Sequence, residues 1–416
     1  MQLALSEHLL ANGLRVVLAP SRRVPLVASA LCYDVGSRNE RPGTSGFAHL
    51  FEHMMFEGSE HVAKGEHFKW IHGFGGQANA TTTTDRTLYF ASVPSSQLPL
   101  LLWLEADRMR SLDVSSENLE NQRATVLEER RQRYENAAYG QASLRAGELS
   151  YGCWAYQHPV IGSVEDIERA TLDMVRGFHA TWYRPGNAVL AIAGDFEPDQ
   201  ALALLEGWFA PIADRPVGTA PDLADPPRTG PVVETLHDGL AQLPLVLVNH
   251  QAPAFGTEAF WAHEVLESVL FGGPSSRIYR RMVHDQRIAV QVGGGYDARR
   301  GPSLFAFQGV VGQDADPDVL VRAWFEELER LATERLPDQE RERVKNQLRA
   351  GRVYAQEGVL RRARSLAETT LATGDPHWEE HYLERIAAVS DQAVMDAAAA
   401  MAPDSRVELR VLPESP

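Results

Sequence analysis

The sequence has little cysteine and no excess of basic residues. Only 2 of its 416 residues are cysteine, Cys32 and Cys153, and they form no Cys-x-x-Cys pair or Cys/His cluster. A disulfide framework and a structural zinc knot are therefore excluded as the basis of the fold. Acidic residues outnumber basic ones by 56 to 40, so the net charge is −16. A surface of that sign repels phosphate backbones, and we expect no nucleic-acid partner.

Long hydrophobic runs are also missing. No apolar stretch comes near the roughly 18 residues that a membrane-spanning helix needs. The chain opens MQLALSEHLL, without a basic region ahead of its short apolar patch, so the sequence predicts neither a signal peptide nor a membrane partner. We expect a cytoplasmic protein. Its 44% hydrophobic and 23% charged residues are typical of a globular protein, and 416 residues suit two domains.

A proline-rich stretch divides the chain into two halves of similar length. Residues 211–231 hold six of the 24 prolines and lack apolar periodicity, which predicts a stiff, extended linker. We therefore predict an N-terminal domain at residues 1–210 and a C-terminal domain at residues 232–416. At an offset of 214 residues, GFAHLFEHMMFEG matches FWAHEVLESVLFG, which indicates that the second half repeats the first.

Each half contains strands, then helices, then further strands. This order indicates an α+β fold in which each half has a mostly antiparallel sheet covered by helices. From apolar spacing and β-branched content, the predicted strands are 14–18, 27–35, 79–93 and 188–193, and the predicted helices are 47–56, 100–109 and 116–134, with Ser116 as a helix N-cap.

Residues 49–53, HLFEH, form an HxxEH pattern on a predicted helix. Residues four apart lie on one face of a helix, so His49 and His53 can reach one metal ion. Glu52 lies near the same face and can act as a general base without being a ligand. Zinc suits this role because it lowers the pKa of its bound water to about 7. The alternative is an amphipathic helix that carries two surface histidines.

The repeat cannot carry the same chemistry in the second half. Leu266 stands opposite Glu52, and Glu267 stands opposite His53. We therefore predict one zinc ion per chain and a C-terminal domain that is structurally similar but metal-free.

The motif lies among further segments that form a recognisable set. They are, in chain order, NGLRVVL, DVGSRNE, GTSGFAHLFEHMMFEGS, GGQANATTTTDRTLYF, LWLEADRM, QRATVLEERRQRYEN, HPVIGSVEDI and YRPGNAVLAIAGDF. In these segments the chain resembles the inverted-motif zinc peptidases of the pitrilysin or insulinase family, and within it the shorter branch that includes the mitochondrial processing peptidase. The resemblance implies two similar halves assembled as a clamshell. It also implies a zinc metalloendopeptidase for unfolded or short peptides, leader or processing peptides among them.

The resemblance also implies roles for particular residues. His49 and His53 would bind zinc, and Glu52 would be the catalytic base. The family takes its third ligand from a glutamate about 80 residues after the first histidine, which is Glu129 here. Glu128 is its competitor, one residue away and about 100° around the helix, and only one of the two can face the histidine helix.

The third-ligand segment departs from some family members at one position. Seven residues before Glu129, where those members carry another glutamate, this chain has Gln122. Gln122 can hydrogen-bond but adds no charge near the metal.

Substrate contacts are implied for Asn79 and Ala80. They match the family's N-A-x-T strand, whose edge pairs with an extended peptide. The alternative is an ordinary edge strand. Three further histidines near the motif, His61, His67 and His72, are interpreted as surface residues.

The second half lacks a substrate clamp that the family often has, an arginine followed about seven residues later by a tyrosine. His284 stands at the arginine position, Val290 falls near the tyrosine position, and the next tyrosine is Tyr296. We therefore expect a dimer, with a heterodimer that includes a related clamp-bearing subunit favoured over a homodimer.

Two other functions compete with a peptidase. A non-catalytic scaffold or assembly subunit of a peptidase-like complex would tolerate loss of the residues that make up the zinc site. All four of them are present here, namely His49, Glu52, His53 and Glu129. A metal-dependent hydrolase of non-peptide esters or amides would not need the strand at Asn79. Manganese or cobalt could stand in place of zinc, because the same ligands accept them.

Overall fold

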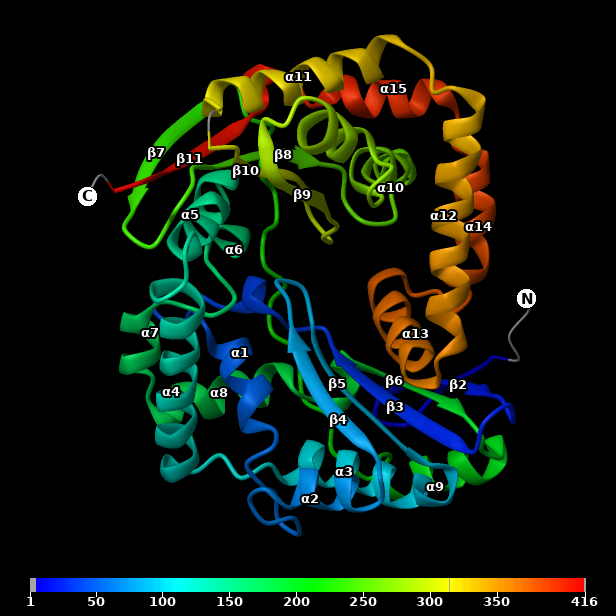
Figure 1. Cartoon of the computed structure of the whole chain (residues 1–416). Coiled ribbons are helices and arrows are strands. Elements are labelled where there is room, and N and C mark those ends of the chain that lie inside the picture. Colours follow the sequence, from blue (N-terminus) through cyan, green and yellow to red (C-terminus); the bar gives the residue numbers. More distant parts are fainter. Residues whose placement is uncertain (1–4, 314, 415–416) are drawn as a thin grey trace. The chain divides into compact units, whose positions relative to one another are not determined.

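The structure is a computed structural model that describes residues 5–313 and 315–414 (Figure 1). Its strands are β1 (Ser6–Leu9), β2 (Arg15–Pro20), β3 (Leu26–Tyr33), β4 (Gln77–Thr82), β5 (Thr87–Pro94), β6 (Ala188–Gly194), β7 (Val232–Asp238), β8 (Leu245–Ala252), β9 (Ala289–Asp297), β10 (Ser303–Val311) and β11 (Val407–Pro413). Its α-helices are α1 (Phe47–Met54), α2 (Glu66–Gly73), α3 (Leu98–Ser111), α4 (Ser116–Arg130), α5 (Gly140–Ser150), α6 (Trp154–Gln157), α7 (Val164–Arg169), α8 (Leu172–Trp182), α9 (Pro198–Trp208), α10 (Glu258–Phe271), α11 (Pro317–Thr333), α12 (Asp338–Glu357), α13 (Val359–Thr373), α14 (Trp378–Ala388) and α15 (Asp391–Ala400). Shorter helical segments are η1 (Ser37–Asn39), η2 (Ser95–Gln97), η3 (Arg131–Glu135), η4 (Pro185–Asn187), η5 (Tyr279–Asp285) and η6 (Pro403–Ser405).

The chain forms two compact units, each built from three stretches of sequence. Unit 1 takes its described residues from Met1–Glu128, His158–Pro221 and Val353–His381, and unit 2 takes its own from Glu129–Gln157, Asp222–Arg352 and Tyr382–Pro416. Each unit thus contains a segment from the other half of the sequence, which supplies α13 to unit 1 and α5 to unit 2. A single division of the chain at the proline-rich stretch leaves out this exchange of segments between the two halves.

Unit 1 is built on a six-stranded sheet in the order β1-β2-β6-β3-β5-β4, in which β2 and β6 are parallel and all other neighbours antiparallel. Figure 1 shows α13 over one face of this sheet and α3 and α9 along the other. On the α13 face, Ala363 and Leu366 pack with Ala28, Ala30 and Cys32 of β3. Because both faces are covered, β3 is a nearly continuous apolar strand, LVASALCY.

Unit 2 has a five-stranded sheet in the order β7-β11-β8-β10-β9, in which β7 and β11 are parallel and the other neighbours antiparallel. Ala146 of α5 packs in a buried cluster with Leu245 and Leu409 of this sheet. Trp324 of α11 stacks on Phe307 of β10, with ring centroids 4.6 Å apart. Helices again supply the apolar surface that the strands bury against.

The two sheets share one topology. The order β2-β6-β3-β5-β4 in unit 1 corresponds, strand by strand and in direction, to β7-β11-β8-β10-β9 in unit 2. The repeat proposed at an offset of 214 residues places α1 within α10, and each of these helices follows the middle strand of its sheet. The predicted α+β fold with two similar, mostly antiparallel halves is confirmed.

The predicted single strand over residues 79–93 is wrong in one respect. The segment forms two strands, β4 and β5, joined by a tight turn. In the turn, the Thr83 amide donates to the Arg86 carbonyl at 2.9 Å, and the Thr83 hydroxyl accepts from the Asp85 amide at 3.2 Å. No glycine or proline marks this turn, and the β-branched threonines hide it from a propensity argument.

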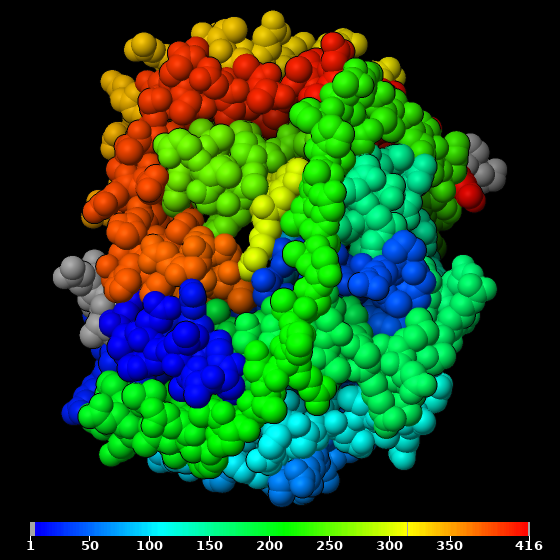
Figure 2. Space-filling model, turned by 180° about the vertical axis from the view of Figure 1, so that it is seen from behind, coloured from blue at the N-terminus to red at the C-terminus, as the bar shows by residue number. Residues whose placement is uncertain are grey.

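The proline-rich stretch between the two halves of the sequence has no regular secondary structure. Residues 211–231 contain no helix or strand, since proline has no amide hydrogen to donate to either. Figure 2 shows the green part of the chain that includes this linker as an extended thread on the surface. None of the helices in the described part of the chain combines the length and apolarity needed to cross a bilayer.

Candidate metal centre

The HxxEH motif lies on α1, a helix of eight residues. Phe47, Leu50, Phe51 and Met54 are fully buried and fix the helix in unit 1. The imidazole rings of His49 and His53, one turn apart, have centroids 4.9 Å from each other. The predicted helical face with two histidines is therefore present.

Two buried tyrosines hold the backbone of α1 from behind. The Tyr89 hydroxyl donates to the Phe51 carbonyl at 2.8 Å, and the Tyr183 hydroxyl donates to the Ala48 carbonyl at 3.3 Å. Burial raises the pKa of both phenols above its ordinary value. Both tyrosines therefore stay protonated and remain hydrogen-bond donors to the motif helix.

The start of α1 is capped by a side chain from outside the helix. The residue before α1 is Gly46, at φ 91°, where a Cβ would lie 3.0 Å from the Gly162 Cα. Glu40 accepts from the amides of Gly46 and Ala48, both at 2.8 Å, and lies 2.9 Å from His158 Nε2. Burial raises the pKa of the Glu40 carboxyl, and the contacts with His158 and the two amides oppose that rise.

Helix α4 has the predicted position with a different cap. It begins at Ser116, and the Ser115 hydroxyl accepts from the Asn118 amide at 3.4 Å. The capping residue is therefore Ser115, and the prediction of Ser116 is wrong by one residue. Two adjacent serines have the same capping preference, so only the backbone geometry distinguishes them.

Glu129 and Glu128 differ in their surroundings. The boundary between unit 1 and unit 2 falls after Glu128, inside the last turn of α4. Both residues nevertheless belong to this one continuous helix. Gln122 and Val126 mark the buried face of this helix. Glu128 is exposed, whereas Glu129 is half-buried.

The structure brings the three predicted metal ligands together. One ligand atom from each of His49, His53 and Glu129 lies within 4.8 Å of the other two. Two ligands of a tetrahedral zinc ion are roughly 3.4 Å apart, so small side-chain rotations suffice to close this triangle around an ion. Two imidazoles and one carboxylate form a donor set that zinc accepts, and the residues fit the metal. No second group of three such donors occurs among the residues that the structure describes.

Glu129 also forms an ion pair. Arg133 Nη1 lies 2.9 Å from Glu129 Oε1, and the Arg133 side chain is 65% exposed. Exposed ion pairs contribute little to stability, so this contact is a weak competitor for the carboxylate.

The predicted substrate strand is an edge strand. Among the described residues, β4 ends the six-stranded sheet, pairs with β5 alone and contacts α1. Asn79 is exposed, and its side-chain oxygen accepts from the Ala80 amide at 2.8 Å. The Ala80 side chain is buried. The motif helix and a free strand edge therefore lie next to each other within unit 1.

The prediction that His61, His67 and His72 are surface residues is wrong for His67. His67 is 4% exposed and packs edge to face against Phe56, and its burial lowers its pKa well below the usual value. It shares the buried face of α2 with Ile71, four residues on. His61 and His72 are exposed, as predicted.

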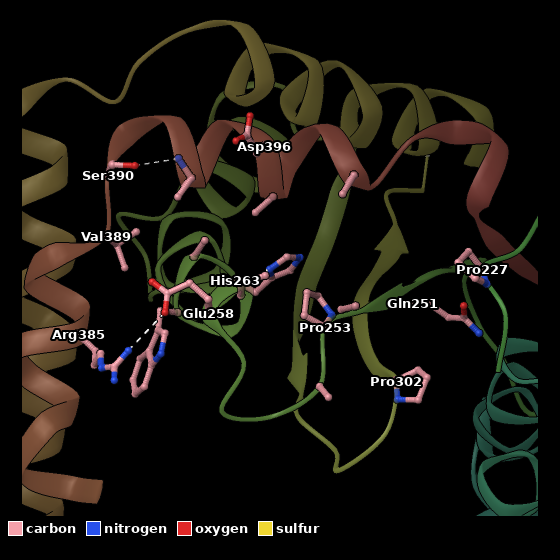
Figure 3. Close-up of a pocket in the computed structure, with 18 of the residues that line it drawn as sticks. Pro227, Gln251, Pro253, Glu258, His263, Pro302, Arg385, Val389, Ser390 and Asp396 are labelled. Carbon is pink, nitrogen blue, oxygen red and sulfur yellow. Dashed lines mark hydrogen bonds and ion pairs between the residues drawn. The ribbon is translucent and has the colours of Figure 1, made fainter. Parts of the chain in front are cut away.

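Unit 2 has a cavity of about 980 Å³ beside α10, the counterpart of the motif helix (Figure 3). His263, at the position of the first motif histidine, lines this cavity, and its Nδ1 lies 2.9 Å from the Ala259 carbonyl oxygen. Glu267 stands at the position of the second, and burial together with the neighbouring Glu264 raises its pKa to about 7. The surface of the cavity is mostly alanine, proline and other apolar groups, so it does not reproduce the donor set of α1.

The segment that could carry a substrate clamp has different chemistry. His284 is exposed and lies 2.7 Å from Asp285, and Val290 of β9 is 55% exposed. Tyr296 is 8% exposed, and its hydroxyl donates to the Pro253 carbonyl. This stretch therefore presents neither a guanidinium at the expected position nor an available phenol.

Comparisons with known proteins agree with this architecture. Residues 15–146 match the family described as Insulinase (Peptidase family M16), and residues 169–348 match the Peptidase M16 inactive domain. The zinc protease PqqE of Helicobacter pylori is 32% identical over 285 residues, which are 68% of this chain and 64% of that protein. An uncharacterized zinc protease of Mycobacterium bovis is 29% identical over 388 residues, 92% of this chain and 88% of that protein.

A solved structure extends the likeness to the whole chain. The crystal structure of a protease from Helicobacter pylori matches with a TM-score of 0.94 and 26% sequence identity, over 99% of this chain and 100% of that one. The two family matches follow each other along the chain and together cover most of it. The chain therefore belongs to the insulinase family of peptidases, M16.

Proposed function

We propose that this chain is a zinc metalloendopeptidase that hydrolyses unfolded or short peptides, leader or processing peptides among them, in the enclosed chamber of the family fold. The observation that carries the proposal is the convergence of His49, His53 and Glu129 on one point. Its second support is the adjacent strand edge of β4.

Each residue of the site has a defined part in the reaction. His49, His53 and Glu129 would hold the zinc ion. A bound zinc ion supplies Lewis-acid polarisation of the substrate carbonyl and lowers the pKa of water at the site to about 7. Glu52, on the same helix, takes the proton from the attacking water and returns it to the leaving amine. Tyr89 and Tyr183 fix the backbone that carries these side chains.

Peptides would bind by adding a strand to β4. Main-chain hydrogen bonds along an open edge hold any extended peptide, whereas a folded protein does not offer such a strand. The Ala80 amide already has an acceptor in the Asn79 side chain. A peptide that used this amide would replace that hydrogen bond and release Asn79 to contact the peptide backbone.

The proposal is tested by digesting a pool of unstructured peptides with the purified chain, alongside measurement of bound metal. We expect close to one zinc ion per chain, and cleavage that a chelator abolishes and added zinc restores, because the metal is part of the site. Products are identified by mass spectrometry. Folded proteins and small esters serve as controls that should not be turned over.

Each other outcome points to a different function. A chain without zinc and without cleavage would be the scaffold subunit, for which zinc is not required. Ester hydrolysis without peptide cleavage would indicate the non-peptide hydrolase. If manganese or cobalt restored the activity equally well, the proposed reaction would stand and only the identity of the metal would change.

We further propose that the complete enzyme is a dimer, with a related subunit that supplies the clamp. The support is that His284 stands at the expected arginine position and that the Tyr296 hydroxyl donates to the Pro253 carbonyl. A second copy of this chain would bring the same side chains, so a heterodimer is favoured over a homodimer.

The isolated chain should therefore cleave peptides slowly, and a related subunit with arginine and tyrosine at these positions should accelerate it. Initial rates are measured at increasing ratios of the second subunit and should saturate at one to one. A variant of the second subunit that lacks its arginine is the matched control and should accelerate less. A homodimer that is fully active alone would contradict this arrangement.

A further inference from the structure

We propose that residues 34–40, between β3 and α1, position the two working parts of the site against each other. We call residues 34–40 the bracket. Within it, Glu40 would fix the position of the motif helix α1, and Arg38 would fix the position of the hairpin that carries β4. Both would be positioning residues, since neither touches the metal ligands' side chains or the peptide. The functional consequence rests on the proposed peptidase activity, whereas the bracket itself is a property of unit 1.

The Glu40 end of the bracket acts on the first turn of α1. A helix leaves its first amides without intrahelical acceptors, and a carboxylate there is favoured by the helix dipole. Gly46 at the N-cap has no side chain to serve this purpose, and Glu40 accepts from the amides of Gly46 and Ala48 instead. Ala48 directly precedes His49. A helix of only eight residues is marginal on its own, so its direction depends on such contacts.

His158 completes this end of the bracket. Its Nε2 lies 2.9 Å from Glu40 Oε2, and its side chain is 8% exposed. Both carboxylate oxygens of Glu40 are therefore engaged, one by the Ala48 amide and the other by the Gly46 amide and His158. In glutamine at position 40, an NH2 group would replace one of the two carboxylate oxygens. That group would face one of these donors, so two donors would meet without an acceptor between them.

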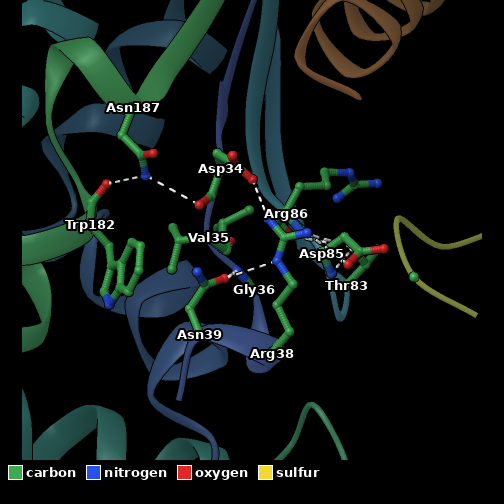
Figure 4. A network of polar contacts seen from close by, with 12 residues as sticks. Asp34, Val35, Gly36, Arg38, Asn39, Thr83, Asp85, Arg86, Trp182 and Asn187 are labelled. Atoms are coloured by element: carbon green, nitrogen blue, oxygen red, sulfur yellow. Dashed lines mark hydrogen bonds and ion pairs between the residues drawn. The ribbon is translucent and has the colours of Figure 1, made fainter. Parts of the chain in front are cut away.

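The Arg38 end of the bracket acts on the turn between β4 and β5 (Figure 4). Arg38 is 4% exposed, and its guanidinium contacts Asp34 of the bracket and Asp85 of the turn, the latter at 3.1 Å. The Arg38 amide also donates to the Thr84 carbonyl at 3.0 Å, and the Ser37 amide donates to the adjacent carbonyl at 3.3 Å. Three of these polar contacts thus join the bracket to the hairpin, and the Arg38–Asp34 pair holds the bracket itself.

The two segments approach too closely for any side chain at Gly36. A Cβ at this position would lie 2.4 Å from the carbonyl oxygens of both Thr83 and Thr84. On the other side of the turn, Arg86 donates to the Thr81 carbonyl at 2.9 Å and pairs with Glu368 of α13. The turn is therefore held on both sides, and through Thr81 so is β4, two residues from Asn79.

The test separates the two ends of the bracket in the metal-free protein. Amide hydrogen exchange is compared for Glu40→Gln and Asp85→Asn, with the exposed Glu60→Gln and Asp173→Asn as matched controls. Glu40→Gln should accelerate exchange about fivefold in α1 and leave β4 unchanged. Asp85→Asn should do the same in β4 and leave α1 unchanged. Asp85→Asn keeps Arg38 in place and so avoids the unfolding that loss of a buried guanidinium could cause.

The functional arms use zinc affinity and peptide kinetics. Glu40→Gln should weaken zinc binding about 10- to 100-fold, the range for residues that orient metal ligands, with little change in KM at saturating zinc. Asp85→Asn should raise KM about tenfold and leave zinc affinity unchanged, because it acts on the peptide-binding strand. Arg38→Lys, which keeps the charge but not the two-sided contact, should resemble Asp85→Asn in milder form.

The outcomes distinguish the bracket from the peptidase. Uniform acceleration of exchange throughout unit 1 by both variants, or none in α1 and β4, would overturn the bracket even if the wild-type chain cleaves peptides. Localised acceleration in a wild-type background that binds no zinc would support the bracket and reject the proposed peptidase. Equal changes of zinc affinity and KM in both variants would show a common structural role and overturn the separate positioning.

Discussion

Replacement of Glu52 by glutamine should remove nearly all peptide hydrolysis and leave zinc binding intact. Glutamine keeps the size of the side chain but cannot accept a proton, and general-base catalysis contributes about 10²- to 10⁴-fold to a rate. Glu52 is not one of the three residues whose ligand atoms converge, so its charge is not needed to hold the ion. The measurement is kcat on a quenched peptide, with bound zinc determined on the same sample.

The matched control for this experiment is Glu60→Gln, the same change at an exposed position a few residues beyond α1. It should retain both zinc and turnover. If Glu52→Gln kept a substantial part of the rate, another group would have to be the base. If it lost zinc, Glu52 would be a ligand, and the roles within the motif would have to be reassigned.

Replacement of Glu129 by glutamine should weaken zinc binding by more than about 100-fold, beyond the range for residues that only orient ligands. The same change at Glu128 should alter the affinity by no more than about twofold, as for a typical surface substitution. The reason is geometric, because Glu129 belongs to the converging group while Glu128 is exposed on the same helix. The measurement is competition for zinc with a chromophoric chelator, followed by peptide turnover.

The pair of variants is its own control, since both remove one negative charge from the last turn of α4. A larger loss of affinity for Glu128→Gln would shift the ligand by one residue. Equal small losses in both variants would mean that no carboxylate of α4 holds the ion. Arg133→Gln, which removes the ion pair of Glu129, should leave zinc binding unchanged or make it slightly tighter.

Local sequence patterns predicted the fold class well. The offset of 214 residues between two helical segments indicated a repeat, and the two sheets have the same strand order. Four-residue spacing was enough to place both motif histidines on one face of α1, because helix periodicity alone decides this. The spacing of about 80 residues also favoured Glu129 over Glu128, which agrees with their different exposure.

Patterns of the same kind failed where neighbouring residues have equal propensities. Thr83 belongs to a turn although threonine favours strands, since its hydroxyl accepts from the Asp85 amide and its own amide donates to the Arg86 carbonyl. Ser115 rather than Ser116 caps α4 because of where the backbone turns. His67 is buried by its place on α2, which a lone histidine in the sequence does not reveal.

The sequence by itself determined the secondary-structure class, the repeat and the motif helix with its two histidines, because each of these can be read from short segments of sequence. The third candidate ligand, Glu129, followed from the family resemblance. Only the tertiary structure decided which distant groups support that helix. Glu40 meets His158 across 118 positions of sequence, and Arg38 meets Asp85 across 47. The exchange of α13 and α5 between the units has the same origin. Such contacts follow from how strands pair and helices pack, and no local spacing encodes them.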